Sequence, residues 1–560
     1  MAHLLAQASG HKSCRALISS QHTQWLTKLS RRTDDNSLRA AAAVALVKLS
    51  RGAGADAAEV VGNQTQAPTT TADDDLVRMM TRLVVSGDDT SLADAIEGLA
   101  YMSTDPHVKE MLVDDSPFLK RLFSVIPRRK GSAALLLEDT TKSPVYGVSV
   151  IIHNLCSYRP RLTEEQAQVA KLRRMAKAPS SSGTPQELEA DPLDDDEHVK
   201  ARGRKLVSCG VLDALTAAVR ATDSRAVRLA VGKALLGLIE DKDNRGKVLQ
   251  AGGAKALTLI IIGVLPSTKS SQSLQSLQLD ASDIEPMQAL AKLAITASPL
   301  QVFGPNEGAL YDAVRPFALM LVHPSANLLQ RFEALMALTN LASSGGAVAS
   351  RVAQADGLLN KVEMLMLEEH VLVRRAATEL ICNLVGGCED VWTRYGGTKA
   401  PGAKSRLQVL AALCDVEDVP TRMAAAGALA VVSASPDACE LLLELQRERH
   451  RVLPILGQLI DPGVVSPPPA GDDVEPDDDE ERESPVSPGL VHRGVVCILN
   501  LFMVVREPAK RTELATEADR IGIVRALVGV VKSSPSNSPA LRPAAEAIKW
   551  LLGSGIEVTI

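Results

Sequence analysis

Residues 373–385 read VRRAATELICNLV, and this stretch decides the fold. Counting from Arg374, apolar side chains follow seven and ten places later, at Ile381 and Leu384. Spacings of seven and three residues place these side chains on one face of an α-helix. The small residues Ala376 and Ala377 stand where a neighbouring helix must come close. The stretch therefore predicts a helix that packs against other helices.

The same phrase, a starting residue followed by apolar residues at +7 and +10, recurs along the chain. Clear copies start at Arg228, Arg331, Arg374 and Arg422, and weaker copies start at Arg39, Leu92, Val145, Asp283 and Val491. The starts at 283, 331, 374 and 422 are 43 to 48 residues apart, close to the period of armadillo and HEAT repeats. We predict an all-α fold, an armadillo/HEAT-like right-handed helical solenoid that offers a long concave surface to another protein.

Composition agrees with this prediction. Hydrophobic residues make up 46% of the chain and aromatic residues only 2%, a mixture that suits helix packed on helix better than sheet. A chain of 560 residues would split into several globular domains, whereas each repeat of a solenoid adds its own slice of core. We therefore expect one continuous superhelix. No apolar run approaches 18 residues, so the sequence predicts no membrane span.

Cysteine usage and the N-terminus indicate the compartment. Eight cysteines occur without a CxxC pair, mostly inside apolar helical phrases, which favours buried free thiols in a reducing environment. Residues 1–33 are basic and contain no acidic residue, as in a mitochondrial transit peptide. The preferred interpretation is that they begin the first solenoid helices, and we expect a cytoplasmic protein.

Three polar segments interrupt the helical pattern: 62–75, 178–198 and 461–489. None can bury enough apolar surface to offset its ordering entropy, so we expect disordered acidic and proline-rich loop insertions. They represent either tolerated length variation or regulation, for example phosphorylation at Ser466, Ser484 and Ser487. Residues 179–198 and 472–483 hold seven and nine acidic residues, so the rest of a chain with net charge −6 is mildly basic.

Catalytic and nucleic-acid motifs are missing from the sequence. It contains no phosphate-binding glycine loop, no HExxH, no G-x-S-x-G and no metal-ligand spacing of histidines. We predict no enzyme activity, no cofactor and no metal. Nucleic-acid binding is also not expected, because the aromatic residues are scattered and no dense Lys/Arg stripe accompanies them.

An asparagine precedes the second apolar residue in four phrases, at Asn154, Asn340, Asn383 and Asn500. Asparagine is mildly unfavourable inside a helix, so its recurrence needs a reason. If the last helix of each repeat lines the concave face, each amide could pair with the backbone of an extended peptide. Alternatively, each amide bonds the adjacent repeat and holds the stack in register. The sequence does not separate these readings.

Charged residues accompany the phrases, and arginine suits a partner surface because its planar fork clamps carboxylates. An exposed face or an ion pair between adjacent repeats is an equally good explanation for any one arginine. The predicted partner-binding residues of the groove are Arg331, Phe332, Glu333, Asn340, Arg374, Arg375, Glu379, Asn383, Arg422, Arg493 and Asn500.

Several stretches carry a family resemblance. Residues 143–178 (SPVYGVSVIIHNLCSYRPRLTEEQAQVAKLRRMAKA) resemble the start of the UCS domain in fungal members of the family of myosin-directed chaperones. Residues 330–343 (QRFEALMALTNLAS), 373–385, 422–431 (RMAAAGALAV) and 492–501 (HRGVVCILNL) resemble later parts of that domain in the expected order. The match covers roughly residues 90–555. It divides the chain into N-terminal and central armadillo repeats (1–142) and a UCS domain (143–560).

The resemblance implies a cytoplasmic co-chaperone that binds the motor domain of the myosin heavy chain, supports its folding and so serves actin-based processes such as cytokinesis. It also implies that the groove residues above face the client. Animal members dock a general heat-shock chaperone through a TPR domain, and no TPR pattern occurs in these 560 residues. Contact with that chaperone by another route, and self-association, stay open.

Two other classes compete with this interpretation. An armadillo scaffold or transport adaptor would bind linear motifs, and transport receptors of this architecture usually place Trp beside the groove Asn. Here Trp25, Trp392 and Trp550 are isolated, which counts against an adaptor. The third class is a regulatory subunit of a larger enzyme.

Overall fold

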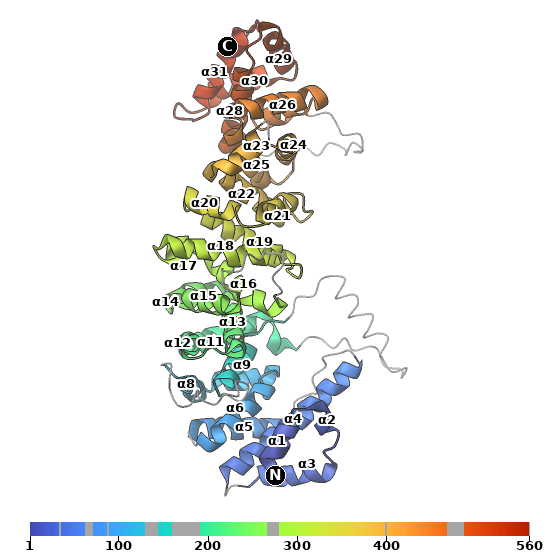
Figure 1. Cartoon of the computed structure of the whole chain (residues 1–560), viewed down its shortest axis with the longest axis vertical. Coiled ribbons are helices and arrows are strands. Elements are labelled where there is room, and N and C mark those ends of the chain that lie inside the picture. The colour runs from blue at the N-terminus through green and yellow to red at the C-terminus, as the bar shows by residue number, and fades with distance from the viewer. Residues whose placement is uncertain are drawn as a thin grey trace. The chain divides into compact units, whose positions relative to one another are not determined.

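The structure is a computed structural model that describes residues 1–32, 35–61, 71–86, 89–128, 144–159, 191–265, 279–397, 400–467 and 487–558. Regular structure within these ranges is helical, with no strand, as predicted (Figure 1). The chain forms two compact units. Unit 1 comprises Met1–Ser271 and Leu279–Thr296, and unit 2 comprises Ala297–Ile560 together with Gln272–Gln278.

Unit 1 is built from short helices that pack in successive repeats. Its elements are α1 (Ala2–Ala8), α2 (Lys12–Arg15), α3 (Ser20–Ser30), α4 (Asn36–Val61), α5 (Thr71–Ser86), α6 (Asp89–Met102), α7 (Pro106–Asp114), α8 (Ser116–Ser124), α9 (Pro144–Cys156), η3 (Pro192–Asp194), α11 (Asp196–Ser208), α12 (Val211–Ala221), α13 (Arg225–Glu240), α14 (Lys242–Gln250), α15 (Gly253–Val264) and α16 (Ala281–Thr296). The phrases starting at Arg39, Leu92, Val145, Arg228 and Asp283 lie on α4, α6, α9, α13 and α16, and each of these helices packs on the next.

Unit 2 repeats this arrangement. Its elements are α17 (Pro299–Phe303), α18 (Glu307–Val322), α19 (Leu328–Ala342), α20 (Gly346–Ala353), α21 (Leu358–Leu365), α22 (Val371–Gly387), α23 (Glu389–Gly396), α24 (Ala403–Leu413), α25 (Val419–Val432), α26 (Pro436–Arg449), α27 (Val452–Gln458), α28 (Pro488–Val504), α29 (Pro508–Arg520), α30 (Ile523–Ser533) and α31 (Leu541–Leu552). The phrases lie on α19, α22, α25 and α28, which pack in that order. Helix α31 continues the row with a copy that the sequence analysis missed: Leu541, Ile548 and Leu551.

Burial explains the phrase. All of its apolar positions at +7 and +10 are buried except Leu46 and Leu49, which are half-buried. In the part of α4 whose burial is described (36–50), the buried apolar residues are instead the run Ala40–Ala45 and Val47. The small alanine side chains let α1, α3 and α6 all approach this helix, so its core face is broader than the phrase.

One glycine marks the closest approach between two phrase helices. In α13 the position equivalent to the recurring asparagine is Gly237, and a Cβ there would stand 2.4 Å from the carbonyl oxygen of Cys156. No larger side chain fits, because the last turn of α9 occupies that space. This packing excludes from α13 the asparagine that α9 carries at the equivalent position, Asn154.

Parts of the three predicted insertions are ordered helix or turn, and the prediction of disorder was wrong there. Residues 71–75 belong to α5, and residues 192–194 and 196–198 belong to η3 and α11. The side chains of Asp191 and Asp195 cap these two elements by accepting from Leu193 N and His198 N. A run of Asp and Pro reads as disorder by composition, yet Asp is a preferred N-cap and Pro is favoured at the first helical position.

The third predicted insertion is also ordered at its ends. Val465 is buried, the N–H of Ser466 donates to Ile521 O at 2.9 Å, and Ser487 and Pro488 begin α28. Residues 62–70, 178–190 and 468–486, with Ser484, lie outside the described residues. The proposed domain boundary at 142/143 does not coincide with the division into units, since α9 packs on both α6 and α13. It rests on family resemblance and stays a prediction.

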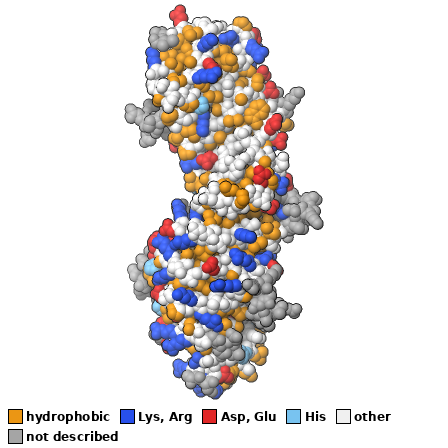
Figure 2. Space-filling view, turned by 90° about the vertical axis from the view of Figure 1, so that its left-hand side faces the viewer, with side chains coloured by type: hydrophobic (Ala, Val, Ile, Leu, Met, Phe, Trp, Pro, Cys, Tyr) orange, Lys and Arg blue, Asp and Glu red, His pale blue; other side chains and the backbone are white. Residues whose placement is uncertain are grey.

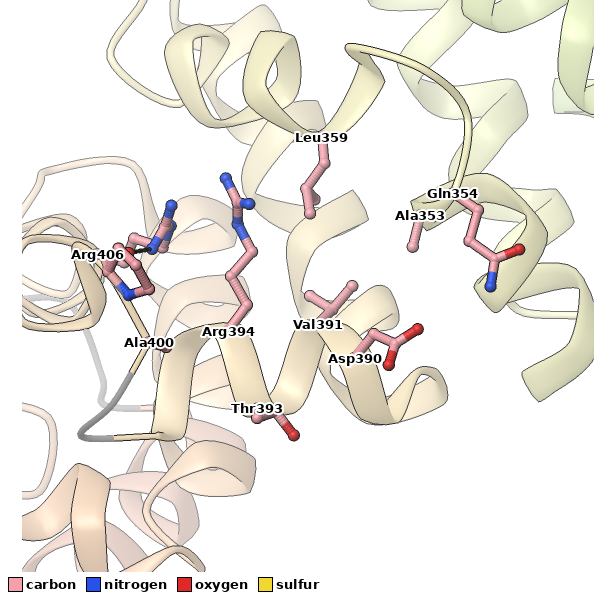
Figure 3. A pocket seen from close by; sticks show the side chains of 10 residues that line it. Ala353, Gln354, Leu359, Asp390, Val391, Thr393, Arg394, Ala400 and Arg406 are labelled. Carbon is pink, nitrogen blue, oxygen red and sulfur yellow. Dashed lines mark hydrogen bonds between the residues drawn. The ribbon is translucent and has the colours of Figure 1, made fainter.

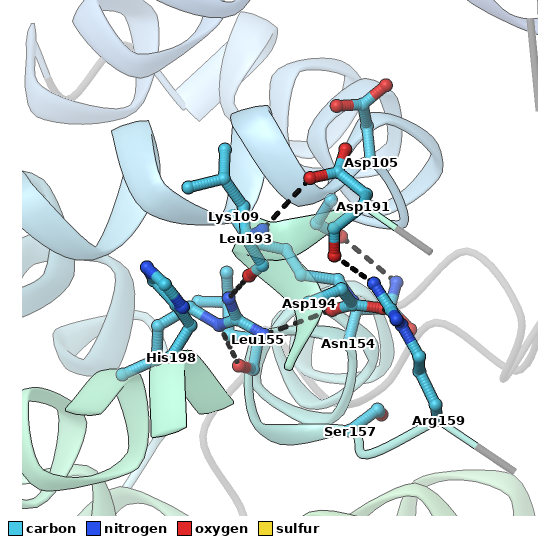
Figure 4. Close-up of polar contacts among 12 residues, drawn as sticks. Asp105, Lys109, Asn154, Leu155, Ser157, Arg159, Asp191, Leu193, Asp194 and His198 are labelled. Atoms are coloured by element: carbon cyan, nitrogen blue, oxygen red, sulfur yellow. Dashed lines mark hydrogen bonds and ion pairs between the residues drawn. The ribbon is translucent and has the colours of Figure 1, made fainter. Parts of the chain in front are cut away.

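A buried arginine holds the segment that precedes α11 (Figure 4). Arg202 of α11 is fully buried; its Nε donates to Leu155 O at 2.9 Å, and its Nη1 donates to Leu193 O at 2.7 Å and to Glu110 Oε1 at 2.8 Å. Its Nη2 lies 3.2 Å from Asp194 Oδ1. The guanidinium thereby ties α7, α9 and η3 to α11.

Asp194 also pairs with Lys109 and Arg159. These contacts hold together the two described residues that flank the segment 160–190, an arrangement called here the closed base. Lys109 Nζ lies 2.8 Å and Arg159 Nε 3.5 Å from the Asp194 carboxylate, and Arg159 also donates to the carbonyl oxygen of Asp191. Arg159 and Asp191 are the described residues on either side of that segment. The two described residues that flank the segment therefore lie next to each other.

This closed base makes the segment replaceable. Substituting residues 160–190 with a short Gly/Ser linker is expected to change the free energy of unfolding by less than about 1 kcal/mol, because loop closure depends only weakly on length when the ends already touch. Thermal and urea unfolding of the full-length chain and the variant would measure this. A large loss of stability would mean that the replaced residues pack on unit 1.

Among the described residues, all eight cysteines are free thiols and no cluster of His, Cys, Asp or Glu is arranged to hold a metal ion. No single described helix is long and apolar enough to cross a membrane. The bent pair α14 and α15, with 81° between its helices, passes the same test by length and composition only.

Candidate functional site

The predicted groove residues lie on one row of helices in unit 2, formed by α19, α22, α25, α28 and α31 and called here the phrase row (Figure 1). Helix α19 carries Arg331, Phe332, Glu333 and Asn340; α22 carries Arg374, Arg375, Glu379 and Asn383; α25 carries Arg422; α28 carries Arg493 and Asn500. Glu333 is buried and the others are half-buried. The repeat thus brings side chains from 170 residues of sequence onto adjoining helices.

Asn154, Asn383 and Asn500 each link their own phrase helix to the one before it. Asn383 Nδ2 donates to Thr339 O at 3.3 Å, and Asn154 Nδ2 donates to Ala100 O at 3.1 Å. Thr339 and Ala100 occupy equivalent positions in their repeats. These hydrogen bonds support the interpretation that the asparagine amides hold adjacent repeats in register. That the half-buried amides also bind a partner stays a prediction.

Serine one turn later supplies a second acceptor for the same amides. Asn154 Nδ2 also donates to Ser103 Oγ at 3.0 Å, and Asn500 Nδ2 donates to Ser433 Oγ at 2.9 Å. Ser103 and Ser433 both stand eleven residues after their phrase start. This serine occurs in only three of the nine phrases, so the sequence carried at most a weak signal of the register role.

The starting arginine of the phrase closes the turn in front of its own helix. Arg374 Nη1 donates to Glu368 O at 3.1 Å, and Arg228 Nε donates to Thr222 O at 3.1 Å. In both cases the acceptor lies six residues earlier. The sequence suggested a partner contact, an exposed face or an ion pair between repeats for these arginines, and this fourth use was not predicted.

Arg375 makes the ion pair between adjacent repeats that the sequence analysis offered as an alternative. Its Nε donates to Asp418 Oδ2 at 3.0 Å, and its Nη2 contacts Oδ1. Asp418 is also the N-cap of α25, accepting from Thr421 N at 3.0 Å. Arg375, together with Thr421 and against the opposing effect of burial, lowers the pKa of Asp418 to about 2.

This pair predicts a pH-dependent contribution to stability. The folded pKa of Asp418 lies below the ordinary 3.8, so its stabilisation is present above about pH 4 and is lost as pH falls towards 2. Asp418→Asn is expected to cost about 1–2 kcal/mol at pH 7, with a difference from wild type that narrows below pH 4. Urea unfolding at several pH values would measure it. Glu417→Gln, an exposed neighbour, is the control, and an equal loss there would contradict the assignment.

Arg493 crosses from α28 to its neighbour α25. Its Nη1 donates to Met423 O, and its Cζ would lie 3.4 Å from a Cβ built on Gly427. The same Cβ would stand 2.9 Å from Cys382 Sγ of α22, so Gly427 allows both side chains to lie over α25. Burial raises the pKa of Glu379, which the charge of Arg375 partly opposes. The centre of the phrase row is therefore polar and half-buried.

Exposed apolar side chains recur at the starts of three helices of the phrase row, a feature that was not predicted from the sequence. The first positions of α19, α22 and α25 carry exposed apolar side chains, and two more precede α22. This apolar ledge consists of Leu328 (40% exposed), Leu329 (44%), Val371 (41%), Leu372 (43%), Val419 (40%), Met364 (66%) and Leu367 (66%). Single exposed apolar residues are ordinary, but recurrence at equivalent places in three repeats indicates an interaction surface.

Unit 1 presents a different surface on α5, α8, α12 and α15, which pack in that order. These helices expose Arg78, Arg82, Lys120, Arg220 and Lys255. Figure 2 shows Lys and Arg side chains gathered over the lower part of the molecule, which is unit 1. The basic body that the charge distribution predicted is therefore evident on this face.

Comparison with known proteins agrees with this architecture. Residues 1–80 match the family model described as "Myosin-binding striated muscle assembly central". The chain is 29% identical over 413 residues to Ring assembly protein 3 of Schizosaccharomyces pombe, covering 72% of this chain and 46% of that protein. It superposes on UNC-45 from Drosophila melanogaster with a TM-score of 0.71 at 26% identity, covering 98% of this chain and 60% of that one. The chain belongs to the UCS-domain family.

Another UCS-family relative is Protein unc-45 homolog B of Danio rerio, 27% identical over 467 residues, covering 82% of this chain and 42% of that protein. The chain thus spans less than half the length of these two curated relatives. The match at residues 1–80 agrees with the resemblance of the N-terminal region to the family's central armadillo domain. Membership of the UCS family also confirms the armadillo-type solenoid fold that the repeated phrase predicted.

Proposed function

We propose that this chain binds the motor domain of the myosin heavy chain and acts as a co-chaperone that assists its folding and stability. The observation that carries the proposal is the apolar ledge beside the polar centre of the phrase row. A partly folded motor domain exposes apolar segments, and the ledge offers matching exposed apolar side chains at regular intervals along three helices. The family model and the relatives named above support myosin as the client.

The mechanism needs no energy source within the chain. Binding lowers the free energy of whichever client state fits the surface, and it withholds apolar segments from other chains. The groove candidates then supply polar contacts beside the ledge: the Glu379 carboxylate for a basic client side chain, and the half-buried asparagine amides for client backbone. We expect this activity in the cytoplasm, where it would serve actomyosin processes such as cytokinesis.

Thermal aggregation of a purified myosin motor domain tests the proposal. Near-stoichiometric amounts of the full chain are expected to suppress light scattering at the temperature where the motor alone aggregates. Citrate synthase heated in the same way is the comparison client, and we expect much weaker protection of it. Unchanged aggregation of the motor, or equal protection of both clients, would overturn the proposal.

A further inference from the structure

A pocket of about 470 Å³ lies in unit 2 on helices α21, α23 and α24 and the end of α20 (Figure 3). None of its lining residues belongs to the phrase row or to the apolar ledge. The proposed client surface therefore does not account for it.

One wall of the pocket carries two guanidinium groups that share a single carboxylate. Arg394 of α23 donates from Nε to Glu363 Oε1 at 2.9 Å and from Nη2 to Oε2 at 2.8 Å. Arg406 of α24 donates from Nε to the same Oε1 at 2.9 Å. The three groups together carry one excess positive charge. Glu363, on α21, holds both guanidiniums in place, so their position does not depend on a ligand.

The rest of the pocket has a different character. Leu359 and Val391 line its middle, and Asp390 stands beyond them, away from the guanidiniums (Figure 3). Asp390 precedes Arg394 by four residues on α23, one helical turn, which is roughly 6 Å along the axis. Although such a pair could meet on the helix surface, Arg394 turns to Glu363 and leaves the exposed Asp390 carboxylate at the other end of the pocket.

We propose that this pocket binds a short extended peptide segment that carries a carboxylate and, two residues away, a basic side chain. Residues i and i+2 of an extended chain point to the same side, so one side chain can face the guanidiniums while the other faces Asp390. Glu363, Asn360 and the carbonyl oxygen of Pro401 use Nε and Nη2 of Arg394 and Nε and Nη1 of Arg406, so the peptide carboxylate accepts from Nη1 of Arg394 and Nη2 of Arg406. The aliphatic stem of the basic residue lies on Leu359 and Val391, and its charge meets Asp390.

Small peptides test the site directly on the full chain. Ac-Lys-Gly-Glu-NH2 and the reversed Ac-Glu-Gly-Lys-NH2 present a side-chain carboxylate, and Ac-Lys-Gly-OH presents a C-terminal one. Ligand-observed NMR titration is expected to give a Kd of about 1 mM for at least one of them, and at least tenfold weaker binding for Ac-Lys-Gly-Gln-NH2. The best of the first three identifies the source of the carboxylate. No binding of any of them at 10 mM would overturn the proposal.

Variants distinguish this pocket from non-specific charge attraction. Arg406→Gln is expected to weaken binding about tenfold, whereas Lys404→Gln, on the same helix but paired with Glu444 and Glu448, is expected to leave it unchanged. Asp390→Lys alters only an exposed residue and is expected to reverse the preference, so that Ac-Glu-Gly-Glu-NH2 binds better than Ac-Lys-Gly-Glu-NH2. Equal losses in the Arg406 and Lys404 variants, or an unchanged preference after Asp390→Lys, would contradict the site.

Discussion

Replacing Arg202 by methionine is expected to lower the free energy of unfolding of unit 1 by about 3–5 kcal/mol. The methionine fills much of the same volume but leaves two backbone carbonyls, of Leu155 and Leu193, without their buried donor. It also leaves Glu110 without its buried cation and removes one of the cations around Asp194, which keeps Lys109. Thermal unfolding followed by circular dichroism would show an earlier transition.

Arg204→Met provides a matched control two residues away on the same helix. Arg204 is about half exposed and pairs with the exposed Asp243 and the buried Asp241, so solvent screens its charge far more than that of the fully buried Arg202. Its loss is expected to cost less than about 1 kcal/mol. If both variants were equally stable, the buried network around Arg202 would not hold unit 1 together in the way described.

Placing aspartates on the apolar ledge is expected to produce the largest loss of client binding. The double variant Val371→Asp, Leu372→Asp removes two exposed apolar side chains from the middle of the ledge and is expected to weaken motor binding at least about tenfold. The fold should tolerate the change, because both positions open α22 and acidic residues are favourable at a helix N-terminus. Surface plasmon resonance with a purified motor domain would measure the affinity.

A second double variant separates the ledge from general hydrophobicity. Val531→Asp, Leu552→Asp replaces two exposed apolar residues of similar exposure on α30 and α31 of the same unit. Motor affinity should stay at the wild-type value. If the ledge variant kept full affinity while folded, the polar centre of the phrase row would have to carry binding alone.

The spacing of apolar residues predicted most of the fold, because the face that a helix buries is determined by residues close together in the sequence. The +7 and +10 positions located nine helices, five in unit 1 and four in unit 2. All of those positions except Leu46 and Leu49 are buried. The ends of the insertions were mispredicted because their order comes from distant partners. Asp194, for example, is held by Lys109 and Arg202, which composition around residue 194 cannot reveal.

The sequence predicted which helices carry the candidate site residues, but it predicted less well which partners these residues contact. The repeat placed Arg375 and Asn383 on the same helix face, yet their partners Asp418 and Thr339 lie more than 40 residues away. Such contacts depend on how neighbouring repeats are offset, which periodicity leaves open. The apolar ledge was not predicted, because the sequence does not show whether an apolar residue such as Val371 or Leu372 is exposed or buried.

The closed base formed by Arg159 and Asp191 has a practical consequence. Because the residues on either side of the segment 160–190 lie next to each other, a guest domain whose own termini lie close together is expected to replace this segment without moving Arg159 and Asp191 apart. A fluorescent protein inserted at this point would report on the chain in living cells while leaving both chain ends available for affinity tags.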